Sequence, residues 1–318
     1  MCAALMTQSR EDKKFEQLIQ KIAPQGKLLR TWALKGGISA QMTALELLLP
    51  DGQTKKVIVR QPGERAIKHN PNAAADEFKI LEIVQSVGVS AQTPYYLDQS
   101  GEIFSEPYLV IEYMEGQPDY APANSSDYVV QMATQLAKIH SIESTKLDLS
   151  FLPKQAERFA GAFKERPAKL DHSLEEARIR HVLEAIWPLP QRNEPVLLHG
   201  DFWPGNILWK DDQLVAVIDW EDAEVGNPLV DFAITRLDLL WIFGVDAMNE
   251  FTRHYQSLTT LDFAQLPYWD LYAALRPMSR IAEWAAGWPE LGRKDITEQT
   301  MREGHRWFIT QAFEKLSV

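Results

Sequence analysis

Three polar side chains occur at a spacing that could bind a divalent cation and activate a hydroxyl group. Asp201 follows His199 and Gly200. Asn206 comes five positions after Asp201, and Asp219 comes thirteen positions after Asn206. Magnesium prefers oxygen ligands, so one carboxylate and one carboxamide suit it. A further carboxylate can accept the proton of a hydroxyl group. We therefore predict that Asn206 and Asp219 bind magnesium, and that Asp201 is the general base of a phosphoryl transfer.

The stretch between Asn206 and Asp219 predicts the element that positions these side chains. Two apolar runs flank a polar turn at residues 210–213, which is typical of a β-hairpin. The returning strand would bring Asp219 back to the level of Asn206. The alternative is that Asp201 and Asp219 are ordinary turn residues at strand ends, where Asp is common. The spacing, the hairpin and the block that follows at residues 226–231 occur together, which favours a site.

A known family shares this pattern. The stretch 197–233, LLHGDFWPGNILWKDDQLVAVIDWEDAEVGNPLVDFA, resembles the catalytic core of the aminoglycoside phosphotransferase and choline kinase-like family. These proteins are small-molecule kinases with a fold similar to that of protein kinases. The resemblance implies that Asp201 is the catalytic base and that Asn206 and Asp219 bind the metal. It also implies that Asp231 is a buried carboxylate at a helix start that braces the catalytic loop.

Two further polar residues lie next to this core in the sequence. Glu221 comes two positions after Asp219, and therefore on the same side if the strand continues. We predict that Glu221 contacts the metal, a bound water or the acceptor. His199 is predicted to be a structural residue of the catalytic loop, because Asp201 already supplies the proton acceptor.

Residues earlier in the chain suit the binding of nucleotide phosphates. Gly36, Gly37 and Ser39 come just before the first predicted strands. Glycine lets the backbone approach phosphate oxygens and turn its N–H groups towards them. We predict that these residues cover the phosphates, and an ordinary turn before a strand is the alternative.

A cation and a carboxylate further along could complete the phosphate site. In kinase-like folds a cation on the third strand binds the α- and β-phosphates and pairs with a glutamate on a helix. Arg60 ends the apolar run 57–59 and occupies that position. A guanidinium group keeps its charge and can bind phosphate through two hydrogen bonds. Its predicted partner is Glu77, with Asp76 and Glu82 as alternatives.

The strand predicted at residues 108–113 would end at a hinge between two lobes. The adenine would form hydrogen bonds with main-chain groups there, namely the carbonyl of Glu112 and the N–H of Met114. We predict ATP with magnesium as the cofactor pair. GTP is not excluded, because backbone groups make these contacts.

The order of the predicted elements indicates an α+β fold with two lobes. Residues 11–22 show helical spacing of apolar side chains, and residues 45–49 and 57–59 predict a strand pair. Later segments are mostly helical. We predict a kinase-like fold with a small β-rich N-lobe at residues 1–113, which binds the nucleotide. A larger, mostly helical C-lobe at residues 114–318 would carry the catalytic loop, the metal site and the acceptor pocket.

Two helix starts can also be predicted within the second part of the chain. The cluster Ser125–Asp127 supplies N-cap residues before a helix. The stretch Ser173–Glu176 has the pattern of a capping box before another helix.

Composition limits the partners and the compartment. The chain has 318 residues, of which 45% are hydrophobic, and its formal net charge is −11. This charge argues against nucleic acid as a partner. No apolar run approaches the roughly 20 residues that span a bilayer, and the start of the chain lacks a secretory signal. The single cysteine, Cys2, fits a reducing compartment. We therefore predict a cytoplasmic protein.

The acceptor is predicted to be a hydroxylated small molecule, such as an aminoglycoside, an amino alcohol or a sugar. Polar and aromatic residues after the catalytic core are candidates for its pocket, with core packing as the alternative for most of them. They are Asp238, Trp241, Trp269, Asp270, Arg276, Arg280, Glu283 and Trp284.

Two other functions remain as alternatives. A protein kinase would need an activation segment, and only a few residues separate Glu221 from Gly226. A catalytically inactive nucleotide-binding protein would usually lack the base or a metal ligand, and all three predicted residues are present.

Overall fold

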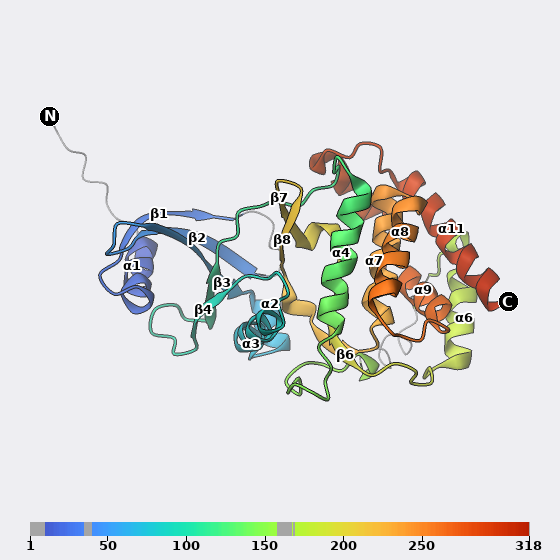
Figure 1. The fold of residues 1–318 in the computed structure, drawn as a ribbon, viewed down its shortest axis with the longest axis horizontal. Helices are drawn as coiled ribbons and strands as arrows, with labels where there is room; N and C mark the ends of the chain where they lie inside the picture. The colour runs from blue at the N-terminus through green and yellow to red at the C-terminus, as the bar shows by residue number, and fades with distance from the viewer. Residues whose placement is uncertain (1–9, 35–39, 158–166, 168, 318) are drawn as a thin grey trace. The chain divides into compact units, whose positions relative to one another are not determined.

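Two compact units make up the described part of the protein (Figure 1). The computed structural model describes residues 10–34, 40–157, 167 and 169–317. The first unit contains the chain up to Ser86 and the segment Ala91–Met114. The second contains Val87–Ser90 and the chain from Glu115 onward.

The first unit is built on a five-stranded antiparallel sheet with the order β1-β2-β3-β5-β4. The strands are β1 (Lys27–Ala33), β2 (Ala40–Leu48), β3 (Thr54–Pro62), β4 (Pro94–Asp98) and β5 (Tyr108–Glu112). The strand pair predicted at residues 45–49 and 57–59 is confirmed, because β2 and β3 pair along their whole lengths.

Helices cover the sheet and supply part of its core. Helix α1 (Arg10–Ile22) buries Phe15, Leu18 and Ile19 against apolar residues of the sheet, as its sequence spacing predicts. Helix α3 (Ala73–Ser86) packs against β3, β4 and β5. The short helix α2 (Glu64–His69) lies between β3 and α3 in the chain and has no buried residue.

The second unit is mostly helical. Its α-helices are α4 (Ser125–His140), α6 (Glu176–Ile186), α7 (Leu229–Phe243), α8 (Val245–Leu258), α9 (Leu266–Leu275), α10 (Ile281–Gly287) and α11 (Glu298–Leu316). Two strand pairs accompany them, β6 (Val196–Leu198) with β9 (Glu224–Gly226), and β7 (Ile207–Lys210) with β8 (Gln213–Val217). Single-turn 3₁₀ helices are η1 (His172–Leu174), η2 (Pro204–Asn206), η3 (Trp220–Asp222) and η4 (Trp288–Leu291).

Helix α7 is the centre of this unit. All but one of its 15 residues are buried, because α8, α9 and α11 pack around it. A helix that is buried on every side has no amphipathic stripe, and its polar residues therefore need partners inside the protein. The sheet-rich first unit and the helical second unit confirm the predicted α+β class.

The two predicted helix starts need correction. The N-cap of α4 is Asn124, one residue earlier than predicted, and its side chain accepts a hydrogen bond from the N–H of Asp127. The capping box predicted at Ser173 is wrong, because Ser173 lies in η1 and Asp171 caps that turn instead. A capping box does occur at the start of α11, where Thr297 and Thr300 bond reciprocally.

No helix among the described residues is both long enough and apolar enough to span a membrane.

Candidate active site

The predicted hairpin is present and brings Asn206 beside the segment that carries Asp219. Strands β7 and β8 are joined by Asp211 and Asp212, which both have positive φ angles of 51° and 59°. This conformation matches the twist of a two-residue hairpin loop. The N–H of Ile218 donates to the carbonyl oxygen of Asn206 at 2.9 Å. Two residues distant in the sequence are thus held together by the ladder.

Asp201 has a hydrogen-bond partner on each carboxylate oxygen. Its Oδ2 accepts from Asn206 Nδ2 at 3.0 Å, and the same amide nitrogen also donates to the Asp201 carbonyl at 2.9 Å. Its Oδ1 forms an ion pair with Arg276 Nη2. Burial raises the pKa of Asp201, while the positive charge of Arg276 opposes this shift. The carboxylate is therefore held in one orientation.

The buried carboxylate of Asp231 anchors the loop that carries Asp201. This carboxylate is fully buried in the first turn of α7. It accepts hydrogen bonds from the backbone N–H groups of His199 at 2.6 Å and Gly200 at 3.0 Å. Gly200 adopts a left-handed conformation with φ of 83°, and a Cβ atom there would overlap the carbonyl oxygen of Asp222. Only glycine fits this part of the loop.

The His199 ring connects the loop to the end of β8. Its Nε2 lies 3.0 Å from the carbonyl oxygen of Ile218, and its Nδ1 accepts from the N–H of Asp201 at 3.3 Å. This pattern assigns the ring proton to Nε2. The ring also packs against Trp220, with centroids 4.6 Å apart. His199 therefore holds backbone groups and has no contact that would make it a proton carrier for a substrate.

Asn206 and Asp219 offer the oxygen ligands that magnesium prefers. The amide nitrogen of Asn206 is bonded to Asp201, so its oxygen is the atom that could bind a cation. Asp219 follows β8 in a left-handed conformation with φ of 65°. The described residues contain no group of three or more His, Cys, Asp or Glu side chains arranged to hold a metal. A magnesium site here would therefore use one carboxylate and one amide with phosphates and water, which magnesium accepts.

The prediction that Glu221 and Asp219 lie on the same side of a continuing strand is wrong. Strand β8 ends at Val217, and Asp219 turns the chain into the 3₁₀ helix η3. Glu221 is an exposed residue of η3, so it does not share a strand face with Asp219. Its role beside the metal or the acceptor stays a prediction.

Residues from α7 and from the segment after α9 come together beside Asp201. Arg276 pairs with Asp201, and its Nη1 also lies 3.4 Å from Asp238 Oδ2. The guanidinium groups of Arg276 and Arg280 each lie 5.4 Å from the ring centroid of Trp284. The sequence indicated these residues only as members of a long candidate set. Their contact with Asp201 depends on tertiary packing that no local pattern reveals.

Two other acceptor candidates are core residues. Asp270 forms a buried two-bond ion pair with Arg236, at 2.6 and 2.7 Å, and also accepts from Gln311. Trp241 is buried and donates to the carbonyl oxygen of Met301 at 2.9 Å. These contacts join α7 to α9 and α11.

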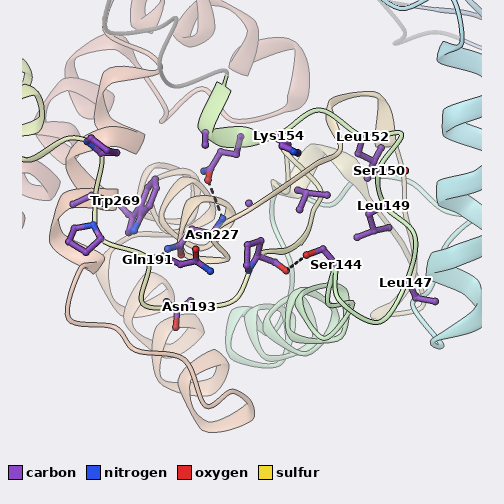
Figure 2. A pocket seen from close by; sticks show the side chains of 18 of the residues that line it. Ser144, Leu147, Leu149, Ser150, Leu152, Lys154, Gln191, Asn193, Asn227 and Trp269 are labelled. Atoms are coloured by element: carbon purple, nitrogen blue, oxygen red, sulfur yellow. Dashed lines mark hydrogen bonds between the residues drawn. The ribbon is translucent and has the colours of Figure 1, made fainter.

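Trp269 lines a pocket of the second unit that does not include Asp201 (Figure 2). The pocket has a volume of about 770 Å³, and Trp187 meets Trp269 edge to face there, with ring centroids 5.8 Å apart. Pro195 and Gly226 also line it, at the opposite end of the β6–β9 pair from the loop that carries Asp201. Apart from Trp269, none of the predicted site and acceptor residues that the structure describes lines this pocket. A role of Trp269 on the acceptor side stays a prediction.

In the first unit, Arg60 pairs with Glu77, the partner that the sequence favoured. The distance from Arg60 Nε to Glu77 Oε2 is 2.8 Å, and both residues are buried. Such a pair fixes the direction of the guanidinium group, whose role towards phosphate stays a prediction. Gly36, Gly37 and Ser39 lie outside the described residues.

The predicted hinge residues end the first unit. The Glu112 carbonyl already accepts a hydrogen bond from Gln92 Nε2 at 3.0 Å. Its carboxylate accepts from the Thr93 hydroxyl at 2.6 Å. Met114 is the last residue of the unit. A carbonyl oxygen has two lone pairs, so contact with adenine stays a prediction.

This fold and loop define a small-molecule kinase with a kinase-like fold. The chain belongs to the phosphotransferase enzyme family, whose model matches residues 35–275. Solved structures show the same fold. An aminoglycoside phosphotransferase homologue from Ralstonia eutropha is 15% identical and matches with a TM-score of 0.63, covering 94% of this chain and 98% of the other. A spectinomycin phosphotransferase complex with ADP and spectinomycin is 13% identical, has a TM-score of 0.59, and covers 96% and 98% of the two chains.

Curated relatives are larger proteins. Human acyl-CoA dehydrogenase family member 11 is 27% identical over 196 residues, which is 55% of this chain and 24% of that protein. Mouse acyl-CoA dehydrogenase family member 10 is 23% identical over 199 residues, which is 58% of this chain and 18% of that protein. The matched region is thus a quarter or less of the length of these relatives.

Proposed function

We propose that this protein transfers the γ-phosphate of ATP to a hydroxyl group of a small molecule, with Asp201 as the general base. The observation that carries this proposal is the fixed orientation of the Asp201 carboxylate. Asn206 bonds to one of its oxygens, and the backbone that leads to Asp201 is anchored through His199 and Asp231. A base must be held within hydrogen-bond reach of the proton that it accepts.

Four residues have separate parts in the proposed reaction. Asp201 accepts the proton of the acceptor hydroxyl and directs its oxygen towards the γ-phosphate. Asn206 orients Asp201 through its amide nitrogen and, with Asp219, binds magnesium through oxygen. Bound magnesium would neutralise charge on the phosphate oxygens. Asp231 keeps the loop in place, because two backbone N–H groups depend on it.

Arg60 and Glu77 supply the proposed contact to the nucleotide. Glu77 fixes the guanidinium group of Arg60. A guanidinium group held in this way can bind phosphate through two hydrogen bonds. Solved relatives of the same fold hold GDP, ADP or ATP. ATP is the proposed donor, and GTP remains an alternative because the proposed adenine contacts at Glu112 and Met114 are made by the backbone.

Replacing the base tests the central role. Asp201→Asn should keep ATP binding, measured by isothermal titration with magnesium, and lower turnover by about 10²- to 10⁴-fold. The substrate screen measures ADP release with hydroxylated metabolites and antibiotics. Near-normal turnover of the variant would refute the assignment of the base. Binding of ATP without turnover by the unmodified protein, across the whole screen, would favour an inactive nucleotide-binding protein.

Replacing the metal ligand tests a separate step. Asp219→Ala should weaken ATP binding only when magnesium is present, because the lost carboxylate acts through the cation. Asp222→Asn is the matched control, since it removes an exposed carboxylate three residues away that is not a predicted ligand. Equal magnesium dependence in both variants would contradict the role of Asp219.

A further inference from the structure

A hydroxyl group that reaches Asp201 comes beside the partners that its carboxylate already has. Both carboxylate oxygens are occupied, one by the amide of Asn206 and one by the guanidinium of Arg276. Asn206 is buried, with 8% of its surface exposed, and it is bonded to the loop backbone as well. The Arg276 side chain is 33% exposed. Arg276 is therefore the partner that an incoming acceptor meets and can compete with.

Arg276 keeps a second partner when this happens. Asp238 lies 3.4 Å from its Nη1 and is itself buried in α7. The indole ring of Trp284 lies near the guanidinium groups of both Arg276 and Arg280. Arg280 is paired with the exposed Glu283 at 3.1 Å. The guanidinium of Arg276 thus stays in place beside the base. Only the N–H group that faces Asp201 needs a new hydrogen-bond partner.

We propose that the acceptor carries an anionic group, a carboxylate or a phosphate, which pairs with Arg276 as the hydroxyl takes its place on Asp201. This inference rests on the proposed function and adds the charge class of the acceptor to it. The anion exchanges one carboxylate partner of Arg276 for another, so no charge-assisted hydrogen bond is lost. A guanidinium group binds carboxylate and phosphate oxygens equally well through its planar N–H groups.

Neutral and cationic acceptors are disfavoured by the same contacts. A neutral alcohol that competes with Arg276 for Asp201 offers the guanidinium group no charged partner in return. An acceptor with an ammonium group would meet two guanidinium groups around Trp284. Asp238 and Glu283 do not offset this, because they already pair with the two arginines.

Matched acceptors test the charge preference. The probes are 3-hydroxybutyrate and glycerol 3-phosphate as anions, 1,3-butanediol and glycerol as their neutral counterparts, and choline as a cation. With ATP and magnesium, each anion should exceed its neutral counterpart in kcat/KM by roughly 10- to 100-fold. The two anionic arms separate carboxylate from phosphate recognition. Equal or better turnover of the neutral or cationic probes would overturn the inference and leave the kinase function intact.

Two arginine variants locate the preference in the protein. Arg276→Gln should remove most of the difference between anionic and neutral probes, mainly by raising KM for the anions, with KM for ATP unchanged. Arg280→Gln is the control, because it removes the same charge beside the same indole but has no contact with Asp201. An unchanged preference in Arg276→Gln, or an equal loss in both variants, would overturn the inference.

A binding measurement separates this inference from the proposed function. Asp201→Ala removes the internal competitor for Arg276, so it should bind both anionic probes roughly tenfold more tightly than the unmodified protein. Titration is done with a non-hydrolysable ATP analogue and magnesium present, which keeps the probes out of the nucleotide phosphate site. Unchanged or weaker binding would overturn the inference. Tighter binding together with no turnover by the unmodified protein would count against the kinase function alone.

Discussion

Two buried carboxylates on helix α7 show opposite behaviour, although they lie only two turns apart. Asp231 in the first turn accepts two backbone N–H groups and faces His140. Burial alone would raise its pKa, but the contact with His140 and the bonds from the His199 region hold the pKa below the ordinary value. Among the described residues, Asp238 pairs with Arg276 alone, at 3.4 Å, and burial raises its pKa to about 7.

Burial does not by itself decide the charge of a carboxylate. A carboxylate with several hydrogen-bond donors stays ionised inside a protein, whereas one with a single distant cation tends to hold a proton. Asp231 therefore serves as a fixed anchor for the catalytic loop. Asp238 changes its protonation near neutral pH, and the charge of Arg276 favours its ionised form.

Removing the anchor should have the largest effect on stability. Asp231→Ala leaves the N–H groups of His199 and Gly200 buried without an acceptor. We expect a loss of about 3–5 kcal/mol in the free energy of unfolding, measured by urea denaturation, together with loss of turnover. Asp238→Ala is the matched control on the same helix and should lose clearly less. Equal losses would break the comparison.

The pH dependence of stability should distinguish the second carboxylate. Between its ordinary pKa of 3.8 and about 7, folded Asp238 holds a proton that the unfolded chain has released. Its contribution to stability is therefore fully present below pH 3.8 and is lost as the pH rises through about 7.

Asp238→Asn should remove this dependence. The unmodified protein should lose on the order of 1 kcal/mol more per pH unit than the variant across this window. Urea denaturation at several pH values between 4 and 8, on the order of one unit apart, would measure the two slopes. Parallel slopes would mean that Asp238 is already ionised in the folded protein at acidic pH.

The smallest expected effect concerns the residue behind the anchor. The Tyr255 hydroxyl lies 2.5 Å from Nδ1 of His140, whose Nε2 faces Asp231 at 3.4 Å. Tyr255→Phe should lower the free energy of unfolding by about 1 kcal/mol and change turnover little, because the backbone bonds to Asp231 remain. Thermal denaturation and the ADP assay would measure both. A loss as large as that of Asp231→Ala would show that the anchor depends on this outer contact.

The sequence predicts the parts of the site that local patterns determine. The hairpin between Asn206 and Asp219 follows from two apolar runs and a polar turn. The hairpin depends on a few neighbouring residues, so its spacing is informative. The pairing of Arg60 with Glu77 is instead expected from the strand and helix positions of kinase-like folds.

Other features depend on contacts between distant segments and could not be predicted. Arg276 reaches Asp201 only because α7 and the segment after α9 pack together. The left-handed backbone at Asp219 ends the strand before Glu221, which an extended pattern does not reveal. Trp269 was grouped with the acceptor side by its type, yet it lines another pocket.

The nearly complete burial of α7 constrains which changes of sequence this helix can accept. Asp231 and Asp238 share one rigid helix, and gaining or losing a single residue between them would rotate one against the other by about 100°. The loop anchor and the partner of Arg276 would then no longer serve the same base. A one-residue insertion or deletion in this interval of α7 should therefore uncouple the loop anchor from the partner of Arg276.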